Sequence, residues 1–179
     1  MKKLSILFVC ALLLFSCQSE DEVQEVKIGK KFSLTIPSFL KRADTLNRES
    51  SLQYQNTFRE FYVLVFDESR EEITKALTEG GLSESDTGNL KVYSDILMAN
   101  FEQGIEVALK ENKKETVING NPAIVMNLAG KSAGVDAYFS IAYIEGKKRY
   151  YQIVVWTLKD RRDKYKDKMD AILMSLKEG

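Results

Sequence analysis

The sequence predicts an α+β fold in which an antiparallel β-sheet is flanked by helices on both faces, as an α-β-α sandwich. Segments with alternating apolar residues follow one another across short turn-forming stretches, which is typical of hairpin strands. Two longer segments repeat apolar residues every three or four positions, as amphipathic helices do. Two strands are apolar on both sides, which indicates that both faces of the sheet are covered.

Seven segments show the pattern of β-strands. They are residues 31–36, 51–55, 60–66, 116–119, 122–129, 135–144 and 149–158. The first alternates from Phe32 to Ile36 and is ended by Pro37. The segments 60–66 and 149–158 are the two that are apolar on both sides. Loops of hairpin length join the later segments, so this part of the sheet is predicted to be antiparallel.

Three segments are predicted to be helices. A capping box, Ser69–Glu72, begins a short helix that runs to about Leu77 and stops at Gly80–Gly81. The longest helix carries an apolar stripe that extends over residues 93–109. The last helix covers about residues 160–176, with one apolar and one charged face.

The N-terminus has the features of a bacterial signal peptide. Lys2 and Lys3 precede an apolar run over residues 4–15, which is shorter than the roughly 20 residues that a helix needs to cross a bilayer. The sequence Leu14-Phe15-Ser16-Cys17 resembles the lipobox of bacterial lipoproteins. This resemblance implies cleavage before Cys17, a diacylglyceryl group on its thiol and anchoring to a membrane through that lipid.

An acidic run follows the lipobox: Gln18, Ser19, Glu20, Asp21 and Glu22. It resembles the surface-export signal of Bacteroidota lipoproteins, and the alternative is an ordinary solvated tether. We therefore divide the chain into a signal peptide (1–16), a lipidated cysteine with its acidic tether (17–29) and one globular domain (30–179). We expect the protein in the cell envelope, anchored by its lipid to the outer membrane. The sequence leaves two alternatives for the domain, the periplasmic face and the cell-surface face of that membrane.

The composition excludes several kinds of active site. The chain has no histidine, and its two cysteines, Cys10 and Cys17, lie in the signal peptide and the lipobox. Nucleophiles paired with histidine and metals bound by histidine or cysteine are therefore excluded from the domain. We expect no catalytic residue, no metal and no cofactor, and a carboxylate-dependent hydrolase is the remaining enzymatic alternative. Removal of Lys2 and Lys3 leaves two more acidic than basic residues, so nothing points to a nucleic acid partner.

Asp67, Glu68, Glu71 and Glu72 form the densest acidic cluster of the domain. Their oxygens are of the type that binds Ca²⁺, but the ligand spacing of an EF-hand is missing. The interpretation that we prefer is capping of the helix that begins after Ser69, where negative charge is favourable.

One surface is a candidate for binding. Lys147, Lys148, Arg149, Tyr150 and Tyr151 place charge and aromatic rings together at a strand edge, where they could contact a phosphate, a glycan or a protein partner. The alternative is that the lysines solubilise the tip of a hairpin and protect its edge from pairing.

Two further features are interpreted as structural. Gly130-Lys131-Ser132 is similar to the end of a phosphate-binding loop, but Val125 stands where that motif needs its first glycine. A hairpin loop over residues 130–134 is predicted instead. Trp156 lies in the most apolar strand, so its ring is predicted to pack in the core.

Several segments together resemble the Mog1/PsbP/DcrB-like fold. They are the strand Phe32–Pro37, the long amphipathic helix, the turn Ile118–Ala123 with its Gly-x-Pro-Ala pattern, and the end of the final helix at Ile172–Leu176. The resemblance covers nearly the whole domain and implies a sheet packed against helices. Its members include photosystem-associated, Ran-binding and bacterial envelope proteins, so the fold does not decide the function.

The anchor, the single small domain and the missing catalytic residue types favour a non-catalytic envelope lipoprotein. It would act as a binding or assembly module at the membrane surface, with an envelope protein as its partner. The alternative is a carrier of a small ligand, a lipid or a glycan, in a pocket between the sheet and the long helix near Gly104. Because glycine destabilises a helix interior by about 1 kcal/mol, we infer that a neighbouring backbone approaches Gly104 closely.

Overall fold

The computed structural model describes residues 22–111 and 113–179, which contain two antiparallel sheets. The larger sheet has the strands β3 (Lys41–Arg42), β4 (Leu52–Asn56), β5 (Phe61–Ser69), β6 (Glu106–Lys110), β7 (Lys114–Ile118), β8 (Asn121–Ser132), β9 (Val135–Glu145) and β10 (Arg149–Leu158). The smaller sheet has β1 (Val23–Ile28), β2 (Phe32–Pro37) and β11 (Lys177–Glu178). The helices are α1 (Arg70–Glu79), α2 (Glu84–Thr87), α3 (Leu90–Glu102) and α4 (Arg162–Leu173), and a single 3₁₀ turn, η2 (Lys159–Arg161), precedes α4.

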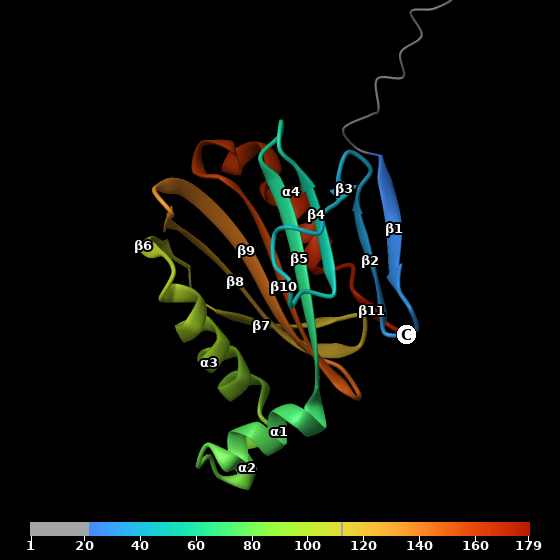
Figure 1. The fold of residues 1–179 in the computed structure, drawn as a ribbon, viewed down its shortest axis with the longest axis vertical. Coiled ribbons are helices and arrows are strands. Elements are labelled where there is room, and N and C mark those ends of the chain that lie inside the picture. The colour runs from blue at the N-terminus through green and yellow to red at the C-terminus, as the bar shows by residue number, and fades with distance from the viewer. Residues whose placement is uncertain (1–21, 112) are drawn as a thin grey trace, which may run out of the picture.

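The large sheet has the strand order β3-β4-β5-β10-β9-β8-β6, and β7 also pairs with β8 (Figure 1). The strands β8, β9 and β10 follow one another in the chain, and each pairs antiparallel with the next. Strand β5, which lies far away in sequence, pairs antiparallel with the other edge of β10. The α+β class and the antiparallel sheet predicted from the sequence are confirmed.

Alternate residues of the central strands enter two separate cores. In β5, Val63 and Val65 belong to the apolar cluster that contains α4, whereas Leu64 between them belongs to the cluster that contains α3. In β10, Val154 likewise belongs to the α3 cluster and Val155 to the α4 cluster. Because successive side chains of a strand point to opposite sides, the two clusters lie on opposite faces of the sheet.

The face that carries α4 is covered by two elements. Tyr165 and Met169 of α4 are at most 1% exposed, and Phe32 and Leu34 of β2 join the same cluster. The smaller sheet therefore shares this face with α4, which the prediction of two flanking helices did not include. All members of both clusters lie between residues 26 and 176, so the described part of the chain carries both cores.

The folded part begins earlier than the sequence predicted. Residues 23–28, assigned above to the tether, form β1, which pairs with β2 along its whole length. The error has a physical reason: β1 is an edge strand in which Val26 and Ile28 pack against the core while alternate residues remain exposed. Such a half-exposed strand is as polar as a linker, so its composition does not reveal it.

The longest predicted helix is two elements. Helix α3 ends at Glu102, and the residues that continue its apolar stripe lie in the following turn and in β6, an edge strand that pairs with β8. Ile105 and Leu109 keep the three- and four-residue spacing of a helix across this junction, which is why the periodicity did not detect it.

The close backbone approach expected at Gly104 occurs at a different glycine. A Cβ atom at Gly104 would meet the carbonyl oxygen of Phe101 at an ordinary 3.7 Å. At Gly130 of β8, a Cβ atom would lie 2.5 Å from Cγ2 of Ile105 and 2.6 Å from the carbonyl oxygen of Glu106. The glycine that permits close packing is therefore in the sheet and not in the helix.

Two local predictions are confirmed. The hydroxyl of Ser69 accepts a hydrogen bond from the backbone N–H of Glu72 at 3.4 Å, and α1 ends at Gly80, before Gly81 with its φ of +93°. The triplet at residues 130–132 ends β8, and Ala133 and Gly134, both at positive φ, turn the chain directly into β9. The hairpin is thus tighter than the predicted five-residue loop, and no helix follows the triplet.

The final helix is shorter than predicted, since η2 precedes it and its last turn ends at Leu173.

Candidate ligand-binding groove

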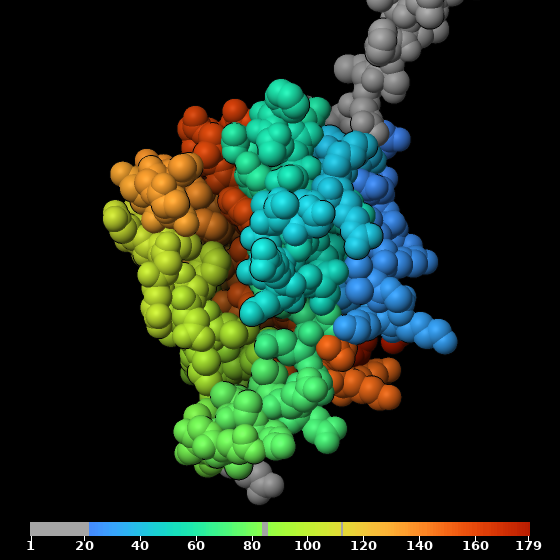
Figure 2. Space-filling view, viewed as in Figure 1, coloured from blue at the N-terminus to red at the C-terminus, as the bar shows by residue number. Residues whose placement is uncertain are grey.

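A groove of about 610 Å³ opens on the α3 face of the large sheet. Strands β5, β10 and β9 supply its floor through residues that include Leu64, Val154 and Phe139, while Phe101 of α3 and the loop around Asn47 form its sides. Figure 2 shows the hollow between α3 and the segment that joins β3 to β4, with β10 visible at its bottom. The volume lies in the range of about 300–1,000 Å³ that small-molecule sites occupy.

An aromatic pair lies on the floor of the groove. Tyr62 of β5 and Trp156 of β10 stand directly opposite each other in the sheet, and their rings stack with centroids 4.9 Å apart and planes inclined by 11°. Trp156 packs against the edge of the α3 cluster, as predicted for a core residue, but it is partly exposed and lines the groove. Both sides of strand β10 are apolar, but helix α3 does not extend over the Trp156 ring.

The wall opposite α3 is held by one side chain of β4. The Oε1 atom of Gln53 accepts hydrogen bonds from the backbone N–H groups of Leu46 (2.9 Å) and Asn47 (3.3 Å). Its Nε2 atom donates to the carbonyl oxygen of Asn47 at 2.5 Å. Leu46 packs at the edge of the α3 cluster. These contacts make the loop a fixed boundary of the groove.

Helix α3 forms the other wall because its apolar side is buried. Tyr93 and Met98 are 3% and 2% exposed, and Phe101 packs edge-to-face on Phe139 with ring centroids 5.3 Å apart. Asn89 caps the helix by accepting a hydrogen bond from the backbone N–H two residues later at 2.8 Å. The groove lies between this packed side of α3 and the Tyr62–Trp156 pair.

The groove carries little charge. Among its lining residues, which all belong to the described part of the chain, Glu60 is the one acidic residue and none is basic. The hydroxyl of Tyr62 donates a hydrogen bond to the Glu60 carboxylate at 2.7 Å. Burial, together with this hydrogen bond, raises the pKa of Tyr62 to about 12, so its hydroxyl stays neutral near pH 7. The lining is therefore mostly apolar and offers no positive charge to a ligand.

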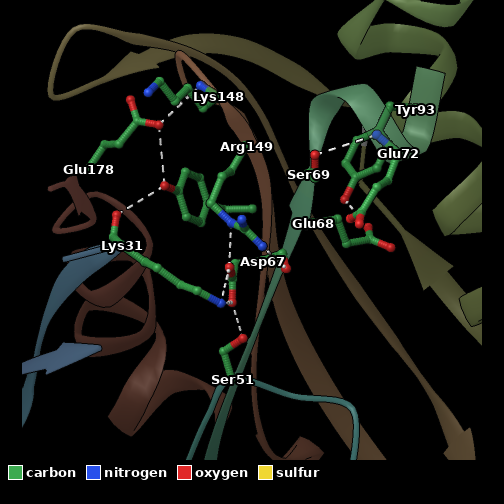
Figure 3. Close-up of polar contacts among 11 residues, drawn as sticks. Lys31, Ser51, Asp67, Glu68, Ser69, Glu72, Tyr93, Lys148, Arg149 and Glu178 are labelled. Atoms are coloured by element: carbon green, nitrogen blue, oxygen red, sulfur yellow. Dashed lines mark hydrogen bonds and ion pairs between the residues drawn. The ribbon is translucent and has the colours of Figure 1, made fainter. Parts of the chain in front are cut away.

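The acidic cluster of the sequence is divided between the two faces of the sheet (Figure 3). Asp67 is fully shielded and pairs with Lys31 at 3.0 Å and with the Nε of Arg149, while the hydroxyl of Ser51 donates to it. Burial alone would raise the pKa of Asp67, but the hydrogen bonds from Ser51 and Lys31 and the charge of Arg149 outweigh it and lower the pKa below its usual value.

The other members of that cluster have separate roles. Glu68 accepts a hydrogen bond from the hydroxyl of Tyr93 at 2.6 Å, and Glu72 belongs to the cap of α1. Within the described residues, no three acidic side chains are placed to hold a metal ion together. The capping interpretation is therefore confirmed for Glu72, whereas Asp67 and Glu68 have other partners.

Three of the five residues of the predicted binding surface, Lys147–Tyr151, are not available at the surface. Tyr150 and Tyr151 are fully buried, one against each face of the sheet, and Arg149 is engaged by Asp67. The sequence placed these aromatic rings at the surface because the strand edge was taken to be exposed; strand β5 pairs along this part of β10 instead.

The two lysines of that surface remain exposed. Lys147 and Lys148 border a depression of about 650 Å³ together with Lys30 and Lys177. The carboxylate of Glu178 accepts from the backbone N–H of Lys147 at 2.9 Å, which ties β11 to the turn between β9 and β10. The turn that borders this basic depression is at the opposite end of β10 from Trp156 of the groove.

The lipidation and sorting predictions fall largely outside the described residues. Cys17 and residues 18–21 are not part of them, and Glu22 is the first residue described. Its carbonyl oxygen accepts a hydrogen bond from the backbone N–H of Ser38 at 2.8 Å. Among the described helices, none has the length and hydropathy needed to span a bilayer.

Known proteins resemble the chain in structure but not in sequence. No protein-family model and no curated protein matches it. The solution structure of cyanobacterial PsbP (CyanoP) from Synechocystis matches with a TM-score of 0.62 at 13% identity, covering 93% of this chain and 99% of that chain. The fold is PsbP-like.

Two other structures share this PsbP-like fold at lower similarity. LpqN of Mycobacterium tuberculosis, which is involved in cell envelope biogenesis, matches with a TM-score of 0.54 at 7% identity over 89% of this chain and 92% of that chain. A protein of Bacteroides thetaiotaomicron matches with a TM-score of 0.52 at 10% identity, and the match covers 86% of this chain and 49% of that one. At these identities the likeness concerns the fold alone.

Proposed function

We propose that the chain is a non-catalytic lipoprotein of the cell envelope whose domain binds a lipid-type ligand in the groove. The observation that carries the proposal is the groove itself, an apolar hollow on the α3 face of the sheet. In this proposal the sheet has α4 on one face and α3 on the other, and α3 serves as a wall of the site. The proposal joins the binding module and the ligand carrier that the sequence suggested.

The lining favours an acyl chain over a sugar. Sugar sites offer a free aromatic face beside several available hydrogen-bonding groups, and here each ring of the Tyr62–Trp156 pair already has a face covered by the other. The Oδ1 atom of Asn47 accepts from the backbone N–H of Glu49, and Gln152 is 9% exposed. The remaining floor is aliphatic and aromatic, which suits an apolar chain that gains by leaving water.

The envelope part of the proposal rests on the N-terminal segment. The resemblance of residues 14–17 to a lipobox supports a lipid on Cys17, and two or three acyl chains give stable anchoring. The fold is shared with LpqN, a protein involved in cell envelope biogenesis, which agrees with an envelope role. We propose anchoring to the outer membrane, and an envelope protein remains the partner that we expect for such a carrier.

The lining does not favour a hydrolase. Carboxylate-pair hydrolysis needs two acidic groups that face each other across the bond to be broken. Glu60 is the single acidic residue among the described residues of the groove, and it holds the hydroxyl of Tyr62. We therefore propose binding without chemistry.

Trp156 offers a direct test because it is the single tryptophan of the chain and lies in the groove. Titration of the protein beginning at Glu22 with monolauroylglycerol, an uncharged acyl ligand, should change its fluorescence saturably. Val135→Lys, which places a charge at the groove, should weaken the affinity about tenfold or more. Val117→Lys is the matched control, since Val117 is similarly exposed on β7 (60% against 50%) and lies outside the groove.

The outcomes separate the alternatives. Saturable binding that Val135→Lys weakens and Val117→Lys leaves unchanged supports the proposal. A response to cellohexaose and none to monolauroylglycerol would replace the lipid with a glycan. No response to either ligand, in protein whose thermal unfolding is cooperative, would reject the groove as the binding site.

A further inference from the structure

The N-terminal end of β1 and the tip of the β4–β5 hairpin lie at the same end of the molecule. A short series of contacts joins them: Glu22 is bonded to Ser38, and the carbonyl oxygen of the next residue, Phe39, accepts from Nδ2 of Asn56 at 2.9 Å. Asn56 ends β4 and begins the turn into β5. In Figure 1 this hairpin and the start of β1 lie at the same end of the molecule. We call this region the Glu22 end.

The hairpin tip presents a phenylalanine to solvent. Phe58 is 94% exposed, more than any other large apolar residue of the described part of the chain. The turn that carries it is well held: the backbone N–H of Arg59 donates to Oδ1 of Asn56 at 3.0 Å, and Arg161 donates to the carbonyl oxygen of Phe58 at 3.0 Å. The Arg59 guanidinium also lies 4.3 Å above the ring of Phe39. A fixed turn with an exposed ring and two adjacent cations is suited to the interface of a bilayer.

The length of the preceding chain limits how far this end can lie from the membrane. Five residues, 18–22, separate the predicted lipid anchor from the domain. Five residues span at most about 17 Å when fully extended. A lipid on Cys17 would therefore hold the Glu22 end, and Phe58 with it, close to the bilayer surface, whereas the basic depression would face away.

The lining of the groove reaches the same end. Glu60, two residues after Phe58, lines it, as do Val135 at the turn between β8 and β9 and Leu158 at the end of β10. The pairing of β5 with β10 places Phe61 opposite Thr157, so the residues just before β5 and just after β10 share one edge of the sheet. The Tyr62–Trp156 pair is the next layer inward from this edge.

We propose that the β4–β5 hairpin tip inserts Phe58 into the bilayer interface and thereby places the mouth of the groove at the lipid surface. This inference rests on the lipid anchor of the proposed function. The ligand is then a membrane lipid that enters the groove from the bilayer, without passing through water.

The test uses the full chain, processed by a lipoprotein-producing bacterium and reconstituted into phosphatidylcholine vesicles. Phe58→Cys supplies a single free thiol for an environment-sensitive dye, since Cys10 leaves with the signal peptide and the thiol of Cys17 is acylated. Lys148→Cys is the control, because Lys148 is exposed at the opposite end of β10. Lipids with a quencher on the acyl chain should quench the dye at position 58 about threefold more than at position 148.

A second variant tests loading of the groove. Phe58→Ser removes the ring from an exposed position, so the fold should persist. It should slow the change in Trp156 fluorescence when lipid is supplied from vesicles by about threefold or more, and leave the affinity for dissolved monolauroylglycerol unchanged.

The failures are distinguishable. Protein that co-floats with vesicles but shows equal quenching at positions 58 and 148, or loads at an unchanged rate after Phe58→Ser, overturns this inference and leaves the groove intact. Protein that does not co-float overturns the anchor, and this inference with it. Protein that co-floats and is quenched at position 58 but binds no lipid supports insertion of the tip and rejects the groove as the lipid site.

Discussion

The two faces of the large sheet are made by alternate residues of the same strands, yet they are covered to different extents. On the α4 face, Tyr165 packs edge-to-face on Phe61 with ring centroids 5.1 Å apart, and both residues are at most 1% exposed. On the α3 face, the stacked rings of Tyr62 and Trp156 remain partly exposed. A groove forms where the cover of a sheet ends and the apolar residues of its strands continue.

The size of the cover explains the difference. Helix α3 has 13 residues and is therefore about 20 Å long and about 10 Å wide, whereas neighbouring strands are about 4.8 Å apart. One such helix covers about two strands, and α3 packs mainly against β8 and β9. It reaches β10 and β5 through Tyr93, whereas Tyr62 and Trp156 near the other end of these strands remain partly exposed. On the other face, the smaller sheet extends the cover that α4 begins.

The largest expected effect is a difference between the two faces in how much free energy of unfolding is lost when an aromatic residue is replaced by alanine. Tyr165→Ala should lower the free energy of unfolding by about 3–5 kcal/mol, because it empties a closed core. Trp156→Ala should lower it by about 1–2 kcal/mol, since part of that ring already contacts solvent. Urea unfolding followed by circular dichroism measures both. Equal losses would mean that the groove face is as tightly packed as the α4 face.

The next effect concerns the ion pairs that close the edge of the α4 face. Asp67→Asn should lower the free energy of unfolding at pH 7 by about 2–3 kcal/mol, because Lys31 and Arg149 lose their shared anion. The exposed Asp136→Asn should change it by less than about 0.5 kcal/mol.

The same residue predicts a dependence on pH. Because the pKa of Asp67 is lower in the folded than in the unfolded protein, its contribution is present above the unfolded value of about 3.9 and is lost as the pH falls through the folded value. The difference between wild type and Asp67→Asn should therefore shrink between pH 5 and pH 2, as measured by urea midpoints. A constant difference across this range would show that the charge of Asp67 does not matter.

A smaller effect tests the close packing of Gly130 in β8 against Ile105 and Glu106, which follow α3. Gly130→Ala should lower the free energy of unfolding by about 1–2 kcal/mol, because its methyl group would meet Ile105 and the backbone of Glu106. Gly88→Ala is the control, since a Cβ atom there meets nothing within 4 Å and its φ is −96°. If the two variants were equally stable, the close packing of β8 against the chain that follows α3 would be in doubt.

The smallest effect lies in the groove. The folded pKa of Tyr62, about 12, exceeds the unfolded value of about 10, so the protonated hydroxyl stabilises the fold below pH 10, and this contribution is lost as the pH rises toward 12. Tyr62→Phe lacks the contribution, so its stability should fall less over this range, by less than about 1 kcal/mol relative to wild type. Urea midpoints at pH 9 and pH 11 measure the difference, and parallel losses in the two proteins would contradict it.

Local patterns in the sequence predict much of this fold. Alternation located β2, β5 and the hairpin strands β8 to β10, and the capping box located α1, because these elements depend on residues near one another in the chain. The junction between α3 and β6 escaped detection because Ile105 and Leu109 keep helical spacing. Strand β1 escaped because an edge strand needs few apolar residues.

The groove could not be predicted in the same way. It depends on β5 pairing with β10, which sets Tyr62 opposite Trp156 and Asp67 beside Arg149 across more than eighty positions of sequence. Both sides of β10 are apolar, and nothing in that pattern tells which side is left open. The available signal was the length of the helix relative to the width of the sheet, and the continuous stripe across α3 and β6 concealed it.

The pairing of β11 with β2 has a consequence for how the protein is made. The small sheet takes its two long strands from the beginning of the domain and its third, through Lys177 and Glu178, from the end, and Glu178 also bonds to the turn after β9. A polypeptide that crosses a membrane from its N-terminus outward cannot complete this sheet until its last segment has emerged. Under the export proposed above, closure of the small sheet would therefore wait until the end of translocation.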